Sequence, residues 1–168
     1  NNPISDKGVL QSTKLVIKGN AKDRYTISTP KEIQGFTIGE GQTTPTDKTK
    51  PILAKKQQIV GSHFDITGFD GAFINNGGKI ALSYVNLIEN ETESSGGAIR
   101  NYLGTVILSG NKKLYANVHS NIADKEGGAI YNKSGILTLK FVNFGNQFEE
   151  NGNDALNGGA IYNLNRLT

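Results

Sequence analysis

The chain has 168 residues, a formal net charge of +3 and no cysteine, so it is of single-domain size and has neither disulfides nor thiol chemistry. Acidic and basic residues are interspersed, whereas nucleic-acid-binding proteins gather basic residues and aromatics on one face, so we expect no nucleic-acid partner. No run of about 18 apolar residues occurs that could cross a bilayer as a helix. Glycine is abundant, at 21 residues, which favours turns and strands over helices.

Residues 1–60 differ from the rest of the chain and are expected to form a β-rich capping region. Residues 15–17 are a short apolar run of β character. Residues 39–51 are polar and contain Gly, Thr, Lys and two prolines, which predicts an exposed loop. Four lysines in or near this loop form either an anion-binding patch or, more simply, a solvated surface; they are Lys48, Lys50, Lys55 and Lys56.

A six-residue motif repeats within residues 61–168, and such repeats take precedence over other fold signals. Gly-Gly-Ala-Ile-Arg-Asn at 96–101 returns as Gly-Gly-Ala-Ile-Tyr-Asn at 127–132 and at 158–163, each time 31 residues further along. A degenerate copy lies at 71–75. We therefore assign residues 61–168 to one repeat domain.

Two further β-prone runs follow each motif. The first comes after a glycine, at 79–82, 105–108 and 136–139, and the second ends in asparagine, at Leu87/Asn90, Val118/Asn121 and Phe148/Asn151. Three runs without a helix predict one coil of three strands per repeat of about 31 residues. The expected fold is all-β, a right-handed parallel β-helix.

Differences between the copies indicate which side chains face inward. Position 100 is Arg where 131 and 162 are Tyr, so this column is expected on the outside, and its neighbours in each motif, Ile and Asn, are expected inside. The other predicted inward columns are Ile80/Val106/Leu137, Leu82/Leu108/Leu139 and Leu87/Val118/Phe148.

The motif residues also have expected roles in the turns. The paired glycines suit a tight corner that needs positive φ, and the small Ala that follows suits a close approach by the next coil. Stacked asparagines are expected to form ladders in which each amide bonds to the next, so that buried polar groups are satisfied.

A Gly-Gly-Ala-Ile motif followed by Phe-x-x-Asn, once per coil, resembles the repeat of the chlamydial polymorphic membrane proteins. The resemblance covers about residues 70–168, although Phe-x-x-Asn is strict only once and chlamydial members often contain cysteine. Both motifs are associated with adhesion in that family. The residues that carry them here are Gly96, Gly97, Ala98, Ile99, Gly127, Gly128, Ala129, Ile130, Gly158, Gly159, Ala160, Ile161, Phe148 and Asn151.

Members of that family are autotransporters, in which a β-helical passenger precedes a C-terminal barrel in the outer membrane. The resemblance implies that this chain is a passenger segment, at the bacterial cell surface or secreted, and touches the membrane only through a barrel that lies outside it. It further implies binding to a host cell-surface protein or glycan receptor. Because strands at an open coil end would be unpaired, we expect the protein to continue past Thr168, or coil ends to self-associate.

The alternative is a polysaccharide-degrading or polysaccharide-binding β-helix, which as an enzyme would need clustered Asp residues. Asp65 and Asp70 are the best pair, but turn positions at a corner explain them more simply. Glu149 and Glu150 are neighbours and point to opposite faces, and Asp154 is a weak cation candidate.

No motif predicts catalysis, a metal or a cofactor, so we expect a binding protein and not an enzyme. His63 and His119 have no second ligand at metal spacing, and Arg100 is expected to be solvated. Tyr131 and Tyr162 are the expected exposed contacts for a partner, with a stabilising ladder between coils as the alternative.

Overall fold

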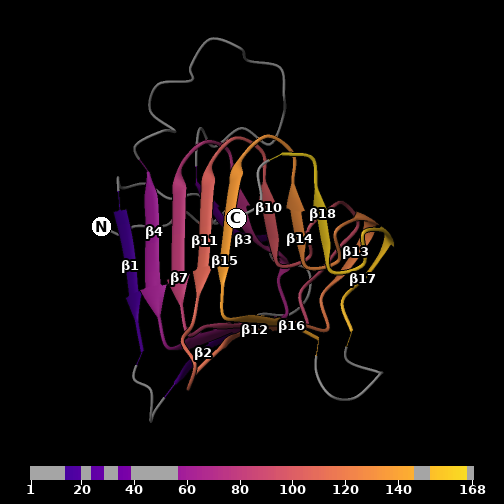
Figure 1. Cartoon of the computed structure of the whole chain (residues 1–168). Helices are drawn as coiled ribbons and strands as arrows, with labels where there is room; N and C mark the ends of the chain where they lie inside the picture. Colours follow the sequence, from indigo (N-terminus) through magenta and orange to yellow (C-terminus); the bar gives the residue numbers. More distant parts are fainter. Residues whose placement is uncertain (1–13, 20–23, 29–33, 39–56, 146–151, 166–168) are drawn as a thin grey trace.

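The structure, a computed structural model, describes residues 14–19, 24–28, 34–38, 57–145 and 152–165. These residues form strands, turns and loops, and none of them is helical. All strand pairings among them are parallel. Figure 1 shows the chain passing through the same three faces coil after coil, so the predicted all-β parallel β-helix is confirmed. No helix able to span a membrane occurs in this described part of the chain.

Sheet 1 receives one strand from each coil, in the order in which the coils follow along the chain. In its three central strands, buried residues alternate with residues that are partly or fully exposed, which is the period that one buried face requires. Its members are β1 (Lys14–Lys18), β4 (Gln58–Ser62), β7 (Lys79–Ser83), β11 (Thr105–Ser109) and β15 (Ile136–Lys140).

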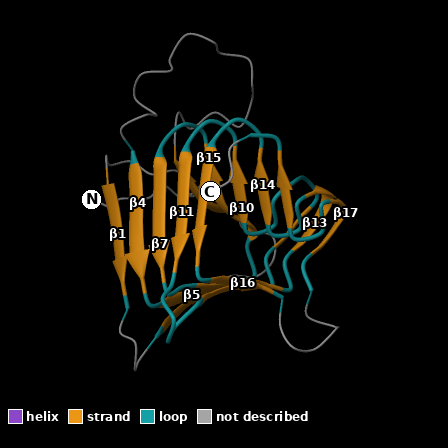
Figure 2. Cartoon of the chain, in the orientation of Figure 1, coloured by secondary structure: helices purple, strands orange, loops and turns teal. Residues whose placement is uncertain are grey.

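Sheet 2 follows sheet 1 in every coil and forms the second face of the solenoid, at the bottom of the view in Figure 2. Its strands are β2 (Tyr25–Ser28), β5 (Phe64–Thr67), β8 (Asn86–Ile88), β12 (Ala116–His119) and β16 (Val142–Phe144).

Sheet 3 differs from the prediction because two strand segments per coil contribute to it. One long strand, β6, pairs with β9 at Asp70↔Glu91 and with β10 at Phe73↔Ile99. In the later coils a glycine pair separates the two segments, so the three-sheet coil has four strands. The strands are β3 (Gln34–Ile38), β6 (Asp70–Asn75), β9 (Glu91–Thr92), β10 (Ile99–Asn101), β13 (Ile122–Glu126), β14 (Ile130–Asn132), β17 (Asp154–Asn157) and β18 (Ile161–Asn163).

The described part of residues 1–60 forms a coil of its own. Strands β1, β2 and β3 pair in parallel with β4, β5 and β6, one on each sheet. They lack the Gly-Gly-Ala-Ile motif, so the periodicity did not reveal them as a coil. The predicted loop at 39–51 lies outside the described residues, as do Lys48, Lys50, Lys55 and Lys56.

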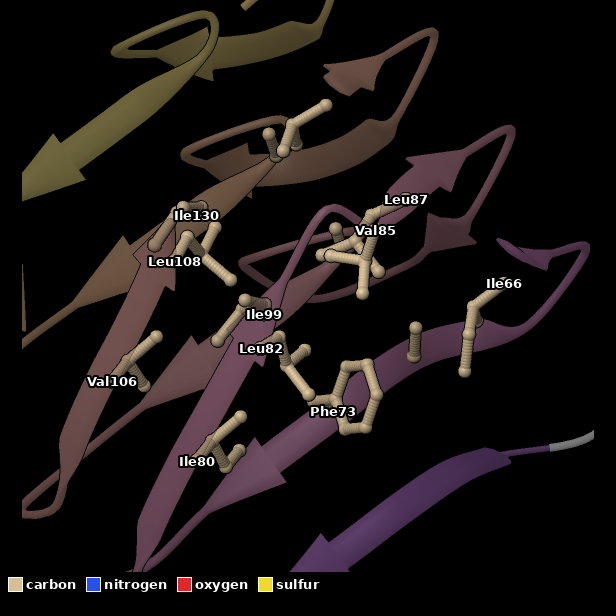
Figure 3. Close-up of a cluster of buried hydrophobic side chains, with 14 of the residues drawn as sticks. Ile66, Phe73, Ile80, Leu82, Val85, Leu87, Ile99, Val106, Leu108 and Ile130 are labelled. Atoms are coloured by element: carbon tan, nitrogen blue, oxygen red, sulfur yellow. The ribbon is translucent and has the colours of Figure 1, made fainter. Parts of the chain in front are cut away.

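The interior is filled by the predicted apolar columns. Ile99 pairs with Ile130, which pairs with Ile161, and the first two are fully buried. The two columns of sheet 1 point inward beside them, as Figure 3 shows for Ile80 and Leu82. The fully buried members of these columns are Ile80, Leu82, Val106, Leu108, Leu137, Ile99 and Ile130.

The predicted third column is right for two coils and wrong for the last. Leu87 pairs with Val118, and both are fully buried. Val118 then pairs with Phe144, so Phe144 takes the position expected for Phe148. Phe148 itself lies outside the described residues.

Candidate functional site

The Gly-Gly-Ala-Ile motif forms the bend in sheet 3, and its two glycines do different things. The first glycine has positive φ in each copy, from 62° to 73°. Neither glycine has room for a side chain. A Cβ on the first would overlap the carbonyl oxygen of the motif's own Ile, in the same coil. A Cβ on the second would meet the next coil: on Gly97 it would lie 2.5 Å from the carbonyl oxygen of Gly128, and on Gly128 it would overlap that of Gly159. The predicted positive-φ corner is therefore confirmed for the first glycine, whereas the second is required by the close approach of the coils.

The rest of the motif is buried. Ala98, Ile99, Ala129 and Ile130 have no exposed surface. Only the copy in the last described coil, at 158–161, is partly open. The motif therefore shapes the scaffold and leaves surface contacts to other residues.

Two internal asparagine ladders tie successive coils together, as predicted. In the first, Nδ2 of Asn101 donates to Oδ1 of Asn132 at 2.7 Å, and Asn132 donates likewise to Asn163 at 2.6 Å. In the second, Asn90 donates to Asn121 at 2.9 Å. Asn121 then donates to Asn153, so Asn153 and not Asn151 continues this ladder. Asn151 lies outside the described residues.

A third ladder runs along the outside of sheet 2. Asn143 donates to Asn117 at 3.1 Å, Asn117 to Asn86 at 2.8 Å, and Asn86 to Asp65 at 2.8 Å. The Asp65 carboxylate also forms an ion pair with Arg24 at 2.6 Å. Asp65 is thus the charged end of a polar ladder in the middle of strand β5, and not a turn residue.

Asp65 and Asp70 do not converge. Asp65 lies on sheet 2 and is paired, whereas Asp70 is exposed at the start of β6 on sheet 3. Asp154 begins strand β17 and is exposed. No group of three or more His, Asp or Glu side chains that could hold a metal ion occurs in the ranges that the structure describes. Glu149 and Glu150 lie outside those ranges.

The predicted outer column on sheet 3 is present. Arg100 pairs with Tyr131, which pairs with Tyr162. The rings of Tyr131 and Tyr162 are nearly parallel, at 8°, with centroids 5.9 Å apart, and Tyr102 meets Tyr131 edge-on at 6.1 Å. Burial, with the nearby Glu126, raises the pKa of Tyr131, so the phenol is neutral at physiological pH.

Arg100 is fixed and not freely solvated. Its Nε donates to the Ser95 carbonyl at 2.6 Å, and one terminal nitrogen donates to the Thr92 hydroxyl at 3.2 Å. It borders an open polar hollow on sheet 3 at the bend; the lining residues are Asp70, Ile74, Thr92, Glu93, Ser94 and Arg100. The hollow and the tyrosine column together give this face both polar and aromatic groups.

Each of the two histidines contacts a neighbouring side chain. His63 stacks on Tyr84, with centroids 4.7 Å apart. Nδ1 of His119 lies 3.0 Å from the Ser120 hydroxyl. Burial lowers the pKa of His119, against the opposing effect of Glu89.

Sequence reasoning missed a surface loop at residues 110–115, between β11 and β12. In neighbouring coils a single residue with positive φ makes this corner, namely His63, Tyr84 or Phe141. The signal was in the spacing, because Leu108 and Val118 are ten positions apart where Leu82 and Leu87 are five apart.

Comparison with known proteins agrees with this geometry over one coil. The family model of the Chlamydia polymorphic membrane protein repeat matches residues 105–133. That segment runs from β11 to just past β14, which is one full turn of the solenoid. The chain therefore carries a repeat of the polymorphic membrane protein type, as its motif predicted. No curated protein and no solved structure matches it.

Proposed function

We propose, starting from the polymorphic membrane protein repeat in this chain, that it is a passenger segment of a surface-exposed bacterial adhesin. In this proposal the segment stands outside the outer membrane and binds a host cell-surface protein or glycan. Its family is associated with the outer membrane, which supports this location.

The observation that carries the proposal is the outer column on sheet 3. Arg100, Tyr131 and Tyr162 lie at one register position on three successive coils. Tyrosine and arginine are the residue types that contribute most to binding at protein surfaces. Their positions are fixed by buried ladders on either side, so little side-chain and backbone freedom is lost on binding.

We propose binding in preference to catalysis for the same chain. A polysaccharide-cleaving site needs two carboxylates that face one substrate. The ion pair and amide contacts of Asp65, and the placement of Asp70 on another sheet, favour a structural role for the first and a surface role for the second.

Adhesion of beads coated with the purified chain to epithelial cells tests the proposal. Replacing Tyr131 and Tyr162 together by Ala is expected to lower bead attachment about tenfold or more, since aromatic hot spots are each worth 1 kcal/mol or more. The matched control is Ile136→Ala, which removes a large exposed side chain from sheet 1, outside the tyrosine column, and should leave attachment unchanged.

Circular dichroism of each variant establishes that the fold is kept. Attachment that survives the double substitution in a folded protein would assign adhesion to another surface. Turnover of host or plant polysaccharides by the unmodified chain, lost in Asp65→Asn, would replace the binding proposal by an enzymatic one.

A further inference from the structure

The corner between sheets 1 and 2 carries bulky ring side chains on left-handed backbone. His63, Tyr84 and Phe141 have φ of 58°, 56° and 54°, in the left-handed region that favours glycine. Each such residue costs about 1–2 kcal/mol relative to a right-handed conformation. Glu89 and Ser120 have the same conformation at the corner between sheets 2 and 3, so it is a shared corner geometry. What distinguishes the corner between sheets 1 and 2 is the aromatic rings that it places along one edge of the solenoid.

The surface loop at residues 110–115 adds positive charge to this edge of the solenoid. Lys112 and Lys113 are exposed at its tip. The loop is tightly held, because the Asn111 amide N–H donates to the Leu114 carbonyl at 2.8 Å and the Asn111 side chain accepts from Lys113 N and Leu114 N at 2.8 and 2.9 Å. In repeat proteins, an insertion confined to one repeat commonly marks the binding face.

Contacts join the loop to the coils on both sides. Nδ2 of Asn111 donates to the Tyr84 hydroxyl at 3.3 Å. The Tyr115 ring meets Phe141 edge-on at 6.0 Å, and the Lys140 ammonium lies 5.9 Å from the centre of the Phe141 ring. We call this surface the corner ridge; it consists of Tyr84, Lys112, Lys113, Tyr115, Lys140 and Phe141.

The charges of the described residues are unevenly distributed around the coil. The corner ridge has three lysines, and Asp65, the acid on the adjoining sheet, is neutralised by Arg24. The half of sheet 3 that precedes the glycine pairs, along β9, β13 and β17, is acidic. Its charged residues are Glu91, Glu93, Asp124, Lys125, Glu126 and Asp154. An anionic partner is therefore attracted to the ridge and repelled from that flank.

We propose that the corner ridge binds an acidic polysaccharide, a sugar polymer that bears sulfate or carboxylate groups. Lysine ammoniums pair with such groups, and those of the ridge come from two neighbouring coils about 4.8 Å apart, so that one polymer can contact both. Aromatic rings cover the apolar faces of sugar rings, and Asn111 with the Tyr84 hydroxyl provides hydrogen-bonding groups for sugar hydroxyls. This ridge is separate from the tyrosine column on sheet 3, so its test does not depend on the adhesion proposal.

Binding of the chain to immobilised heparin, followed as the salt concentration needed for elution and as Kd at about 0.15 M salt, tests the inference. Replacing Lys112 and Lys113 together by Gln is expected to weaken heparin binding about tenfold under these conditions, the size expected when two exposed charge pairs are lost. The Arg counterpart, with both lysines replaced by Arg, should keep the affinity. Dextran, which is neutral, should not bind.

The matched control replaces Lys125 and Lys133 together by Gln, which removes the same charge from other exposed positions. It should leave heparin binding within about twofold, because exposed charges beyond a Debye length are screened. An equal loss in both double variants would overturn the inference, since it would indicate diffuse attraction. So would binding to poly-glutamate as tight as to heparin, or binding to phosphatidylserine vesicles with none to heparin.

Discussion

Asparagine is the residue that ties one coil to the next. Asn101 and Asn132 are fully buried, where an unpaired amide would be costly. Each donates to the next coil and to a carbonyl of its own turn, at 3.1 Å to Gly104 and 3.0 Å to Gly135. The ladder ends at Asn101, whose Oδ1 is a buried oxygen without a hydrogen bond among the described residues, because Asn75 is satisfied by its own turn.

Asn132→Ala should therefore destabilise the fold more than removal of an exposed ladder amide. The change leaves the Asn163 carbonyl oxygen and one N–H of Asn101 without their partner, and we expect a loss of about 2–4 kcal/mol in the free energy of unfolding. Asn143→Ala, at the exposed end of the outer ladder, should cost about 0.5 kcal/mol or less. Urea unfolding followed by circular dichroism measures both free energies. Equal losses in the two variants would contradict the expectation that the buried ladder stabilises the fold more than the exposed one.

His119 makes the stability sensitive to acid. Its pKa is lowered in the folded protein, chiefly by burial, so the unfolded chain binds more protons than the folded one as the pH falls through 6.5, the ordinary pKa of histidine. The contribution of the neutral imidazole is fully present above that pH and is lost progressively below it. His119→Gln should therefore flatten the fall in urea midpoint between pH 7.5 and pH 5.5. An unchanged slope would assign the acid sensitivity to other groups.

The bend of sheet 3 is the element that the repeat motif builds. Strand β6 crosses this face unbroken. In each later coil a glycine pair interrupts the strand, and the second segment is β10, β14 or β18. At the second glycine, backbone oxygens of two neighbouring segments occupy the space of a Cβ, and backbone cannot move aside as a flexible side chain can.

Gly128→Ala is expected to cost several kcal/mol, on the scale of about 3 that severe overpacking imposes. Gly127→Ala should cost at least as much, because φ there is 62° and a Cβ would also overlap the backbone carbonyl oxygen of Ile130. Gly152→Ala is the matched control, since nothing lies within 4 Å of its Cβ position. Thermal unfolding ranks the three, and a Gly128 variant as stable as the Gly152 variant would contradict the close approach.

At the scale of the molecule, stability accumulates along one axis. Strand β10 lies between β6 and β14, and β11 between β7 and β15, so central coils are bonded on both sides. The last described coil has a neighbour on one side only within the described residues, and its Ile161 is only partly buried. Repeat proteins behave as nearly one-dimensional stacks in which each unit stabilises its neighbours.

Hydrogen exchange should follow that axis. We expect the backbone amides of β10, β11 and β14 to exchange at least about tenfold more slowly than those of β17 and β18, because opening is easier where fewer contacts must break. Mass spectrometry of exchanged, pepsin-digested protein resolves these strands. Uniform protection along all coils would indicate a single cooperative unit instead.

The sequence alone determined the period, the sheet-facing pattern and the ladders. A strand turns alternate side chains to opposite faces whatever its surroundings, so comparing residues 99–101, 130–132 and 161–163 was enough to assign the inside and the outside. The glycine pair and the buried asparagines followed from the same local geometry. These residues were predictable because each one packs against the equivalent residue of the next coil, so the same requirement acts on every copy.

Only the tertiary structure decided which residues meet where the repeats differ in length. In the last coil, Phe148 and Asn151 have the motif spacing, yet Phe144 and Asn153 occupy the ladder positions because strand pairing with the coil before fixes the register. The split of sheet 3 and the rigid basic loop at 110–115 likewise depend on contacts between coils. Local spacing specifies which way a side chain points, whereas register across an insertion is set by backbone pairing between segments distant in the sequence.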